Sequence, residues 1–160
     1  MRILHKYFLN LAFLAAIAFS MTACKVEDPW VDASVAPVLV DIVGAPFGYP
    51  QEKDPTVGYA TTVSKLALSA KLLELDKTNI LDNKIGIDSI PVAGIKVVVT
   101  IRDGITLGEV TSNDQGLITL EKTWSELGVA TPKSGQLIKL SWTGSYKGIG
   151  FTRFSQIKAL

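Results

Sequence analysis

The side chains that most enzymes use for nucleophilic or acid–base chemistry are almost missing from this chain. Its 160 residues include one cysteine, Cys24, and one histidine, His5. Both lie near the N-terminus, so the residues after Cys24 offer no imidazole or thiol as general base, nucleophile or zinc ligand. The sequence therefore predicts a protein that is not an enzyme and that uses no metal or cofactor.

The residues before Cys24 have the composition of a secretory signal peptide. Arg2 and Lys6 form a basic start, and an apolar run extends over residues 7–19, interrupted only by Asn10. A helix over this run is about 20 Å long, which is short of the roughly 30 Å hydrocarbon core of a bilayer. The segment therefore predicts a cleaved signal helix rather than a permanent membrane span.

The end of this segment, Met21-Thr22-Ala23-Cys24, resembles the lipobox of bacterial lipoproteins, although Met21 stands where leucine is usual. The resemblance implies cleavage before Cys24 and attachment of diacylglycerol and palmitate to it, which anchors a protein far more tightly than a single acyl chain. Lys25, in a position where aspartate favours inner-membrane retention, implies the outer membrane of a bacterial cell envelope. The alternative is an ordinary signal peptide followed by a cysteine without a role.

Aspartates are the remaining groups with catalytic or metal-binding chemistry. Two carboxylates can form a glycosidase pair, but each aspartate stands beside turn residues, where aspartate caps and bends the chain. Residues 82–86 match a calcium loop superficially, yet lysine occupies a ligand position and no glutamate follows at the required spacing. Turn formation is therefore favoured, and a small hydrolase is the least favoured function. The aspartates in question are Asp76, Asp82, Asp88, Asp103 and Asp114.

An aromatic-rich segment is the candidate ligand site. Residues 44–58 are rich in proline and glycine, which predicts an irregular loop. Phe47 and Tyr49 lie in this segment and Tyr59 directly follows it. Their rings offer flat surfaces for packing against sugar rings. In the alternative, which is the commoner behaviour of loop aromatics, the rings fold under and cap the edge of the domain.

Period-two alternation of apolar residues after residue 35 predicts a series of short strands. Trp142 is expected in the core and Trp124 in a loop that covers it, while Asn113–Gly116 suit the tight turn of a hairpin. Short strands separated by regular turns are typical of a β-sandwich. The predicted strands cover approximately residues 38–43, 66–72, 95–101, 109–112, 117–122, 138–142 and 149–154.

Part of this pattern resembles the bacterial immunoglobulin-like domains of invasin and intimin type. The resemblance covers residues 66–146 and implies an all-β, antiparallel sandwich of about seven strands. Carboxypeptidase regulatory-like and transthyretin-like sandwiches share the same features and are the alternative. An insertion at residues 79–90 and the presence of a single copy argue against a rod-like adhesin stalk. The matching segments are Leu68–Leu72, the Pro-x-x-Gly strand Pro91–Val99 and the Thr-x-x-x-x-Gly turn region Val110–Thr119.

Charge and domain organisation lead to the predicted function. Loss of Arg2 and Lys6 with the leader leaves 14 basic and 15 acidic residues, a balance that does not attract nucleic acid. We expect a signal peptide at residues 1–23, a lipidated tether at residues 24–34 and an immunoglobulin-like domain at residues 35–160. The predicted function is a non-enzymatic cell-surface lipoprotein whose domain contacts an envelope protein or glycan. The alternative is a carbohydrate-binding accessory lipoprotein that uses the aromatic loop.

Overall fold

The computed structural model describes residues 36–46, 54–102 and 104–160. These residues form nine strands and no helix, and none of them belongs to a helix that could span a membrane. The expected all-β class is confirmed, with two strands more than the predicted seven. The strands are β1 (Leu39–Ile42), β2 (Thr56–Tyr59), β3 (Leu66–Asp76), β4 (Asp88–Pro91), β5 (Lys96–Ile101), β6 (Thr106–Thr111), β7 (Leu117–Lys122), β8 (Leu137–Tyr146) and β9 (Ile149–Ala159).

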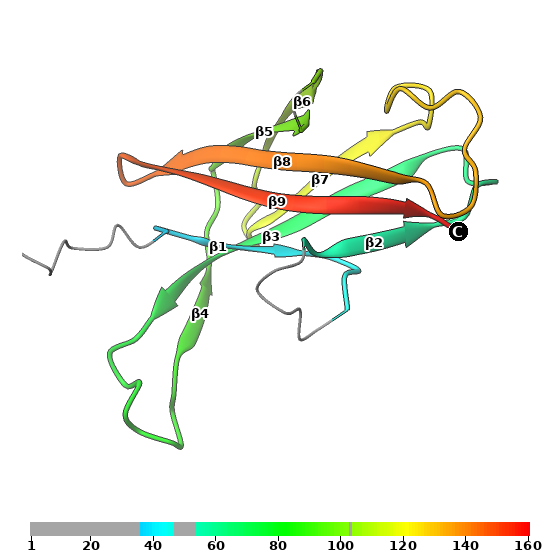
Figure 1. Cartoon of the computed structure of the whole chain (residues 1–160). Helices are drawn as coiled ribbons and strands as arrows, with labels where there is room; N and C mark the ends of the chain where they lie inside the picture. The colour runs from blue at the N-terminus through cyan, green and yellow to red at the C-terminus, as the bar shows by residue number, and fades with distance from the viewer. Residues whose placement is uncertain (1–35, 47–53, 103) are drawn as a thin grey trace, which may run out of the picture. The chain divides into compact units, whose positions relative to one another are not determined.

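The strands form two sheets, which is compatible with a β-sandwich (Figure 1). The smaller sheet contains β1, β3, β4 and β7, and the larger has the order β2-β9-β8-β5-β6. Neighbouring strands run antiparallel except β2 and β9, which are parallel. The expected antiparallel arrangement therefore holds for every pair but this one.

Strand β3 organises the smaller sheet. Its residues 70–73 pair with β1 along one edge. Along the opposite edge, β7 pairs with residues 66–71 and β4 with residues 73–76. Because β1 reaches no further than residue 73, β3 and β4 continue beyond the rest of the sheet as a two-stranded ribbon, visible in Figure 1 as the green projection.

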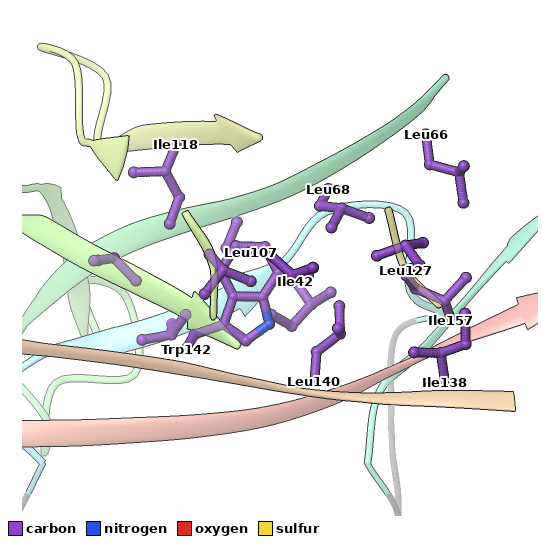
Figure 2. Close-up of a cluster of buried hydrophobic side chains, with 14 of the residues drawn as sticks. Ile42, Leu66, Leu68, Leu107, Ile118, Leu127, Ile138, Leu140, Trp142 and Ile157 are labelled. Atoms are coloured by element: carbon purple, nitrogen blue, oxygen red, sulfur yellow. The ribbon is translucent and has the colours of Figure 1, made fainter. Parts of the chain in front are cut away.

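The core consists of the alternating apolar positions that the sequence marks (Figure 2). Trp142 is 1% exposed, as expected, and its indole Nε1–H donates a hydrogen bond of 2.8 Å to Ser155 Oγ. Trp124 is buried in the loop after β7, so it covers the core as expected. The buried apolar residues within the predicted strands include Val38, Val40, Ile42, Leu66, Leu68, Ala70, Leu72, Ile95, Val97, Val99, Ile138 and Leu140.

The predicted hairpin around Asn113–Gly116 is wrong, although the turn itself is present. Asn113 Oδ1 accepts hydrogen bonds from the amides of Gln115 and Leu117, and Gly116 has a φ of +70°. The strands on either side belong to different sheets, because β6 pairs with β5 and β7 pairs with β3. Turn chemistry reverses the chain locally but does not choose the strand's partner, so this turn is a corner between the sheets.

The predicted irregular loop over residues 44–58 is also wrong in part. Strand β2 begins at Thr56 and pairs in parallel with Gln156–Ala159 of β9. Four residues that include Gly58 carry little periodic signal of their own. The uncovered edge of β9 supplies the hydrogen-bond partners that make this segment a strand. Strand β4, which lies in the inserted segment 79–90 and the residue after it, gains its pairing from β3 in the same way.

Candidate binding site

A groove opens between the two sheets where β1 begins and β3 ends. We call it the β1–β9 groove. Its volume is about 590 Å³, which falls within the roughly 300–1,000 Å³ usual for ligand sites. One wall comes from the smaller sheet and the other from β9 of the larger sheet. The lining residues are Ala36, Pro37, Val38, Leu39, Val40, Glu74, Leu75, Lys77, Phe151, Thr152 and Arg153.

The floor of the groove is apolar because inward-facing side chains of both sheets meet there. Val38, Val40 and Phe151 are all buried. Phe151 pairs across the sheet with Gly144, and a Cβ atom at Gly144 would lie 2.7 Å from the phenyl Cζ and 2.9 Å from Lys96 O. The missing side chain at Gly144 therefore leaves room for the Phe151 ring beside β8.

One wall of the groove is an uncovered strand edge. β2 pairs with β9 only over Gln156–Ala159, and no other described strand pairs with the outer edge of Ile149–Ser155. The amides of Gln156 and Leu160 donate toward the segment that contains β2. Because amide direction alternates along a strand, the amide of Thr152 points to the same side. Among the described strands, none pairs with these backbone groups, which lie beside the apolar floor of the groove.

A three-residue polar cluster stands at the rim. Glu74 accepts hydrogen bonds from Lys147 Nζ and, at 2.8 Å, from Tyr146 Oη. The hydrogen bonds from Lys147 and Tyr146 lower the pKa of the Glu74 carboxyl, and the bond to Glu74 raises the pKa of Lys147. The carboxylate and the ammonium are therefore both charged at neutral pH, and they join the end of β3 to the β8–β9 turn.

The β8–β9 turn itself has an unusual backbone. Lys147 has a φ of +50° and Gly148 a φ of +78°, as in a two-residue turn with both central residues left-handed. Side chains other than glycine, asparagine and aspartate rarely adopt such a φ. Lys147 is the single non-glycine residue with positive φ in the described part of the chain. The ion pair with Glu74 holds the Lys147 ammonium group beside the groove-lining residue Glu74.

A second polar cluster lies outside the groove, along the larger sheet. Arg102 donates to Asp54 Oδ2 at 2.6 Å and stacks 4.1 Å from the centroid of the Phe154 ring. Burial is the largest single effect on the Asp54 carboxyl and raises its pKa, but hydrogen bonds from Arg102 and Gln156 and the charges of Arg102 and Lys139 together outweigh it, so the pKa is lowered. The cluster attaches the segment before β2 to the end of β5 and to β9, so its role is structural.

The structure describes only some of the site residues that the sequence predicts. Cys24, Phe47 and Tyr49 lie outside the described residues. Tyr59 is half-buried against the core, its hydroxyl donates to Ala67 O at 2.6 Å, and burial raises its pKa. This contact is of the kind expected in the alternative, where an aromatic side chain caps the domain edge. A sugar-binding platform of the three aromatic residues stays a prediction.

Asp76 and Asp82 act as turn formers, whereas Asp88 is the first residue of β4. Asp76 accepts a hydrogen bond from the amide of Thr78, Asp82 from that of Lys84 and Asp88 from that of Ser89. Asp103 lies outside the described residues. Within the described ranges, no three histidine, cysteine, aspartate or glutamate side chains gather as metal ligands would.

Sequence reasoning missed the β1–β9 groove because its parts come from three segments far apart in the chain. The only local signal is the Lys147-Gly148 turn, which does not reveal its partner Glu74. The groove combines an apolar floor, a β9 edge that no other described strand covers and a charged rim, an arrangement suited to holding an extended chain. No protein-family model, curated protein or solved structure matches this chain.

Proposed function

We propose that this chain is a bacterial cell-envelope lipoprotein, anchored through Cys24, that presents one immunoglobulin-like domain for contact with another envelope protein. The anchor is supported by the basic start, the apolar run and the small residues before the sole cysteine. The contact is supported by one observation above all, the uncovered edge of β9 beside the apolar floor of the β1–β9 groove.

The strand order supports the immunoglobulin-like assignment. In that fold the second and fifth strands lie in one sheet, and the third, sixth and seventh lie in the other. Here β3 pairs with β7, while β5, β8 and β9 are consecutive neighbours in the second sheet. The first two strands are divided between the sheets, because β1 pairs with β3 in the smaller sheet and β2 pairs with β9 in the larger sheet. The extra strands β4 and β6 then extend this frame.

Addition of a strand is the binding mode that fits the groove. An extended polypeptide that pairs with an exposed sheet edge gains affinity from main-chain hydrogen bonds and specificity from pockets for alternate side chains. The free edge at Ile149–Ser155 supplies the hydrogen bonds. The floor formed by Val38, Val40 and Phe151 supplies the pocket. The function proposed is therefore capture of an extended segment of a partner protein at the membrane surface.

The anchor is tested by replacing Cys24. Wild-type protein expressed with its leader should partition into detergent and show, by mass spectrometry, an N-terminal cysteine with acyl chains. The Cys24→Ser variant should lose both properties and be released from the membrane. Wild-type protein with a free thiol or with residues 1–23 still attached would refute the anchor.

The binding edge is tested by removing one backbone donor. With a photo-reactive side chain at Arg153, the full-length protein should cross-link in cells to a defined polypeptide. Thr152→Pro should abolish this product because proline has no amide hydrogen. Thr152→Val is the matched control, since it also loses the hydroxyl contact with Thr143 but keeps the amide. Equal cross-linking in both variants would exclude strand addition, and a cross-linked glycan would favour the carbohydrate-binding alternative.

A further inference from the structure

The ribbon formed by β3 and β4, with the connection between them, projects from the smaller sheet (Figure 1). We call residues 74–91 the arm. Its connection is a series of closed turns, with hydrogen bonds from Ile80 to Lys77, Asp82 to Asn79 and Gly86 to Asp82. Asp76 and Asp82 also accept backbone amides within it. The connection is therefore a folded part of the arm, because its turns satisfy backbone amide and carbonyl groups through their own hydrogen bonds.

The outer part of the arm exposes large apolar side chains. Leu81 is 97% exposed, Ile85 60% and Ile80 52%, and Ile87 and Ile90 follow at 45% each. These five are among twelve large hydrophobic residues exposed over the whole described chain, yet they fall within eleven consecutive positions. Single exposed apolar residues need no explanation, but a concentration of them marks an interaction surface.

The arm projects from the end of the domain where the described chain begins. β1 runs antiparallel to β3 with Leu39 opposite Leu73, so the residues before β1 run beside the base of the arm. Ala36 and Pro37 accordingly line the same groove as Leu75 and Lys77. From Cys24 to Ala36 an extended chain spans at most about 40 Å. A lipid anchor at Cys24 would therefore keep Ala36 within about 40 Å of the membrane.

The arm carries both signs of charge, with two lysines and four carboxylates within residues 74–91. Lys77 and Lys84 border the apolar tip, and neither forms an ion pair within the described ranges. The carboxylates of Asp76, Asp82 and Asp88 are each turned to a backbone amide. Lysine side chains can lie along a lipid surface with their ammonium groups among the headgroups.

We propose that the arm is a second membrane contact, in which Leu81, Ile80 and Ile85 insert into the lipid interface next to the N-terminal anchor. This inference rests on the proposed lipidation of Cys24 and deepens it. Two contacts on one face would restrict the domain's orientation, whereas a tether alone leaves it free to turn. The β1–β9 groove would then be held at a constant height above the membrane.

A fluorescent probe at the tip tests the inference. In lipidated protein the Cys24 sulfur is a thioether, so Leu81→Cys supplies the only reactive thiol for the polarity-sensitive dye NBD. Ile105→Cys, at the β5–β6 turn and also well exposed, is the matched control. Each full-length protein is reconstituted into vesicles of phosphatidylethanolamine and phosphatidylglycerol, with and without lipids that carry a quencher in their acyl chains. Flotation of the vesicles measures anchoring in the same samples.

The expected result is a blue-shifted, several-fold brighter NBD signal at position 81, quenched by the labelled lipids and unchanged when the protein is diluted among more vesicles. The signal at position 105 should match that of dye in water. A water-like signal at position 81 in protein that floats would overturn the inference and leave the anchor intact. A bright signal that disappears on dilution would overturn it in favour of contact between copies. Failure to float, or labelling of the wild type at Cys24, would refute the anchor and the inference together.

Discussion

At the scale of single residues, two buried serines satisfy hydrogen-bonding groups inside the domain. Ser112 and Ser155 are the buried polar residues of the described chain. Ser112 Oγ donates to Val92 O and accepts from the amide of Ile95. These bonds lie where the chain passes from β6 in the larger sheet to β7 in the smaller sheet. Ser155 Oγ accepts the indole hydrogen of Trp142. Both serines satisfy groups that have no access to water.

Removing the Ser155 hydroxyl should therefore destabilise the domain. Ser155→Ala leaves the Trp142 N–H buried without a partner, which should lower the free energy of unfolding by about 1–3 kcal/mol. Urea denaturation followed by tryptophan fluorescence measures the loss. Ser145→Ala, at an exposed position of β8, should be nearly neutral. Equal stability of the two variants would contradict the role of this hydrogen bond.

Gly116 is required for two separate reasons. Its φ is +70°, and a Cβ atom would lie 2.4 Å from Leu72 O and 3.1 Å from the amide of Val92. Gly116→Ala should lower the free energy of unfolding by roughly 3 kcal/mol, which combines backbone strain with steric overlap. Gly128 has a φ of +79° and nothing within 4 Å, so Gly128→Ala should cost only about 1 kcal/mol. Comparable losses of unfolding free energy in the two variants would mean that the turn at Gly116 shifts to make room for the added methyl group.

At the scale of elements, the loop after β7 is organised by a capping box. The amide and hydroxyl of Thr123 donate to the Glu126 carboxylate, and the amide of Glu126 donates to Thr123 Oγ1. Leu127 closes one helical turn through a hydrogen bond to Thr123 O. This turn buries Trp124 and Leu127 over the core. The sequence pattern Thr-x-x-Glu is the known signature of such an arrangement.

The capping box should make stability depend on pH in a defined window. Hydrogen bonds from the Thr123 backbone and from Lys122 and Thr123 side chains lower the pKa of Glu126 from 4.5 to about 2. Because the folded-state pKa is the lower one, the carboxylate stabilises the fold above pH 4.5, and the gain is lost as the pH falls toward 2. The Tm of the wild type should exceed that of Glu126→Gln at neutral pH and converge with it near pH 2.

A second variant isolates the reciprocal contact. Thr123→Ala removes the hydroxyl half of the box, so the further change Glu126→Gln should lower Tm less in that background than in the wild type. A constant Tm difference between wild type and Glu126→Gln from pH 7 to pH 2 would show that the carboxylate's charge is unimportant.

At the scale of the whole molecule, the described residues bury an apolar cluster of their own. This cluster extends from Val38 to Ala159 and draws on strands of both sheets. A domain with its own hydrophobic core can in principle fold alone. We therefore predict that the chain from residue 36 onward folds without the residues before it.

This independence can be measured directly. A chain that starts at residue 36 should unfold within a few degrees of the lipidated protein when both are followed by circular dichroism in the same detergent. A Tm lower by 10 °C or more would show that the preceding residues pack on the domain. It would also weaken the picture of residues 24–34 as a plain tether.

The amino-acid sequence by itself determined which side chains are buried and where the chain turns. Leu66 to Leu72 and Ile138 to Trp142 reveal their inward faces through period-two alternation, because successive side chains of a strand point to opposite faces. Asn113 and Gly116 reveal a turn for an equally local reason, since few residues tolerate its backbone angles. Both signals are carried by neighbouring residues and need no knowledge of the partner strand.

Only the tertiary structure decided which edges meet. β6 and β7 flank a tight turn but join different sheets, β2 becomes a strand against the free edge of β9, and Glu74 meets Lys147 across 73 positions of sequence. Such pairings depend on which sheet edges are still unoccupied once the core has packed. The alternation of apolar residues does not reveal them, because a strand shows the same pattern whichever strand pairs with it. The β1–β9 groove and the arm arise in this way, where β1 and β2 stop short of the longer strands β3 and β9.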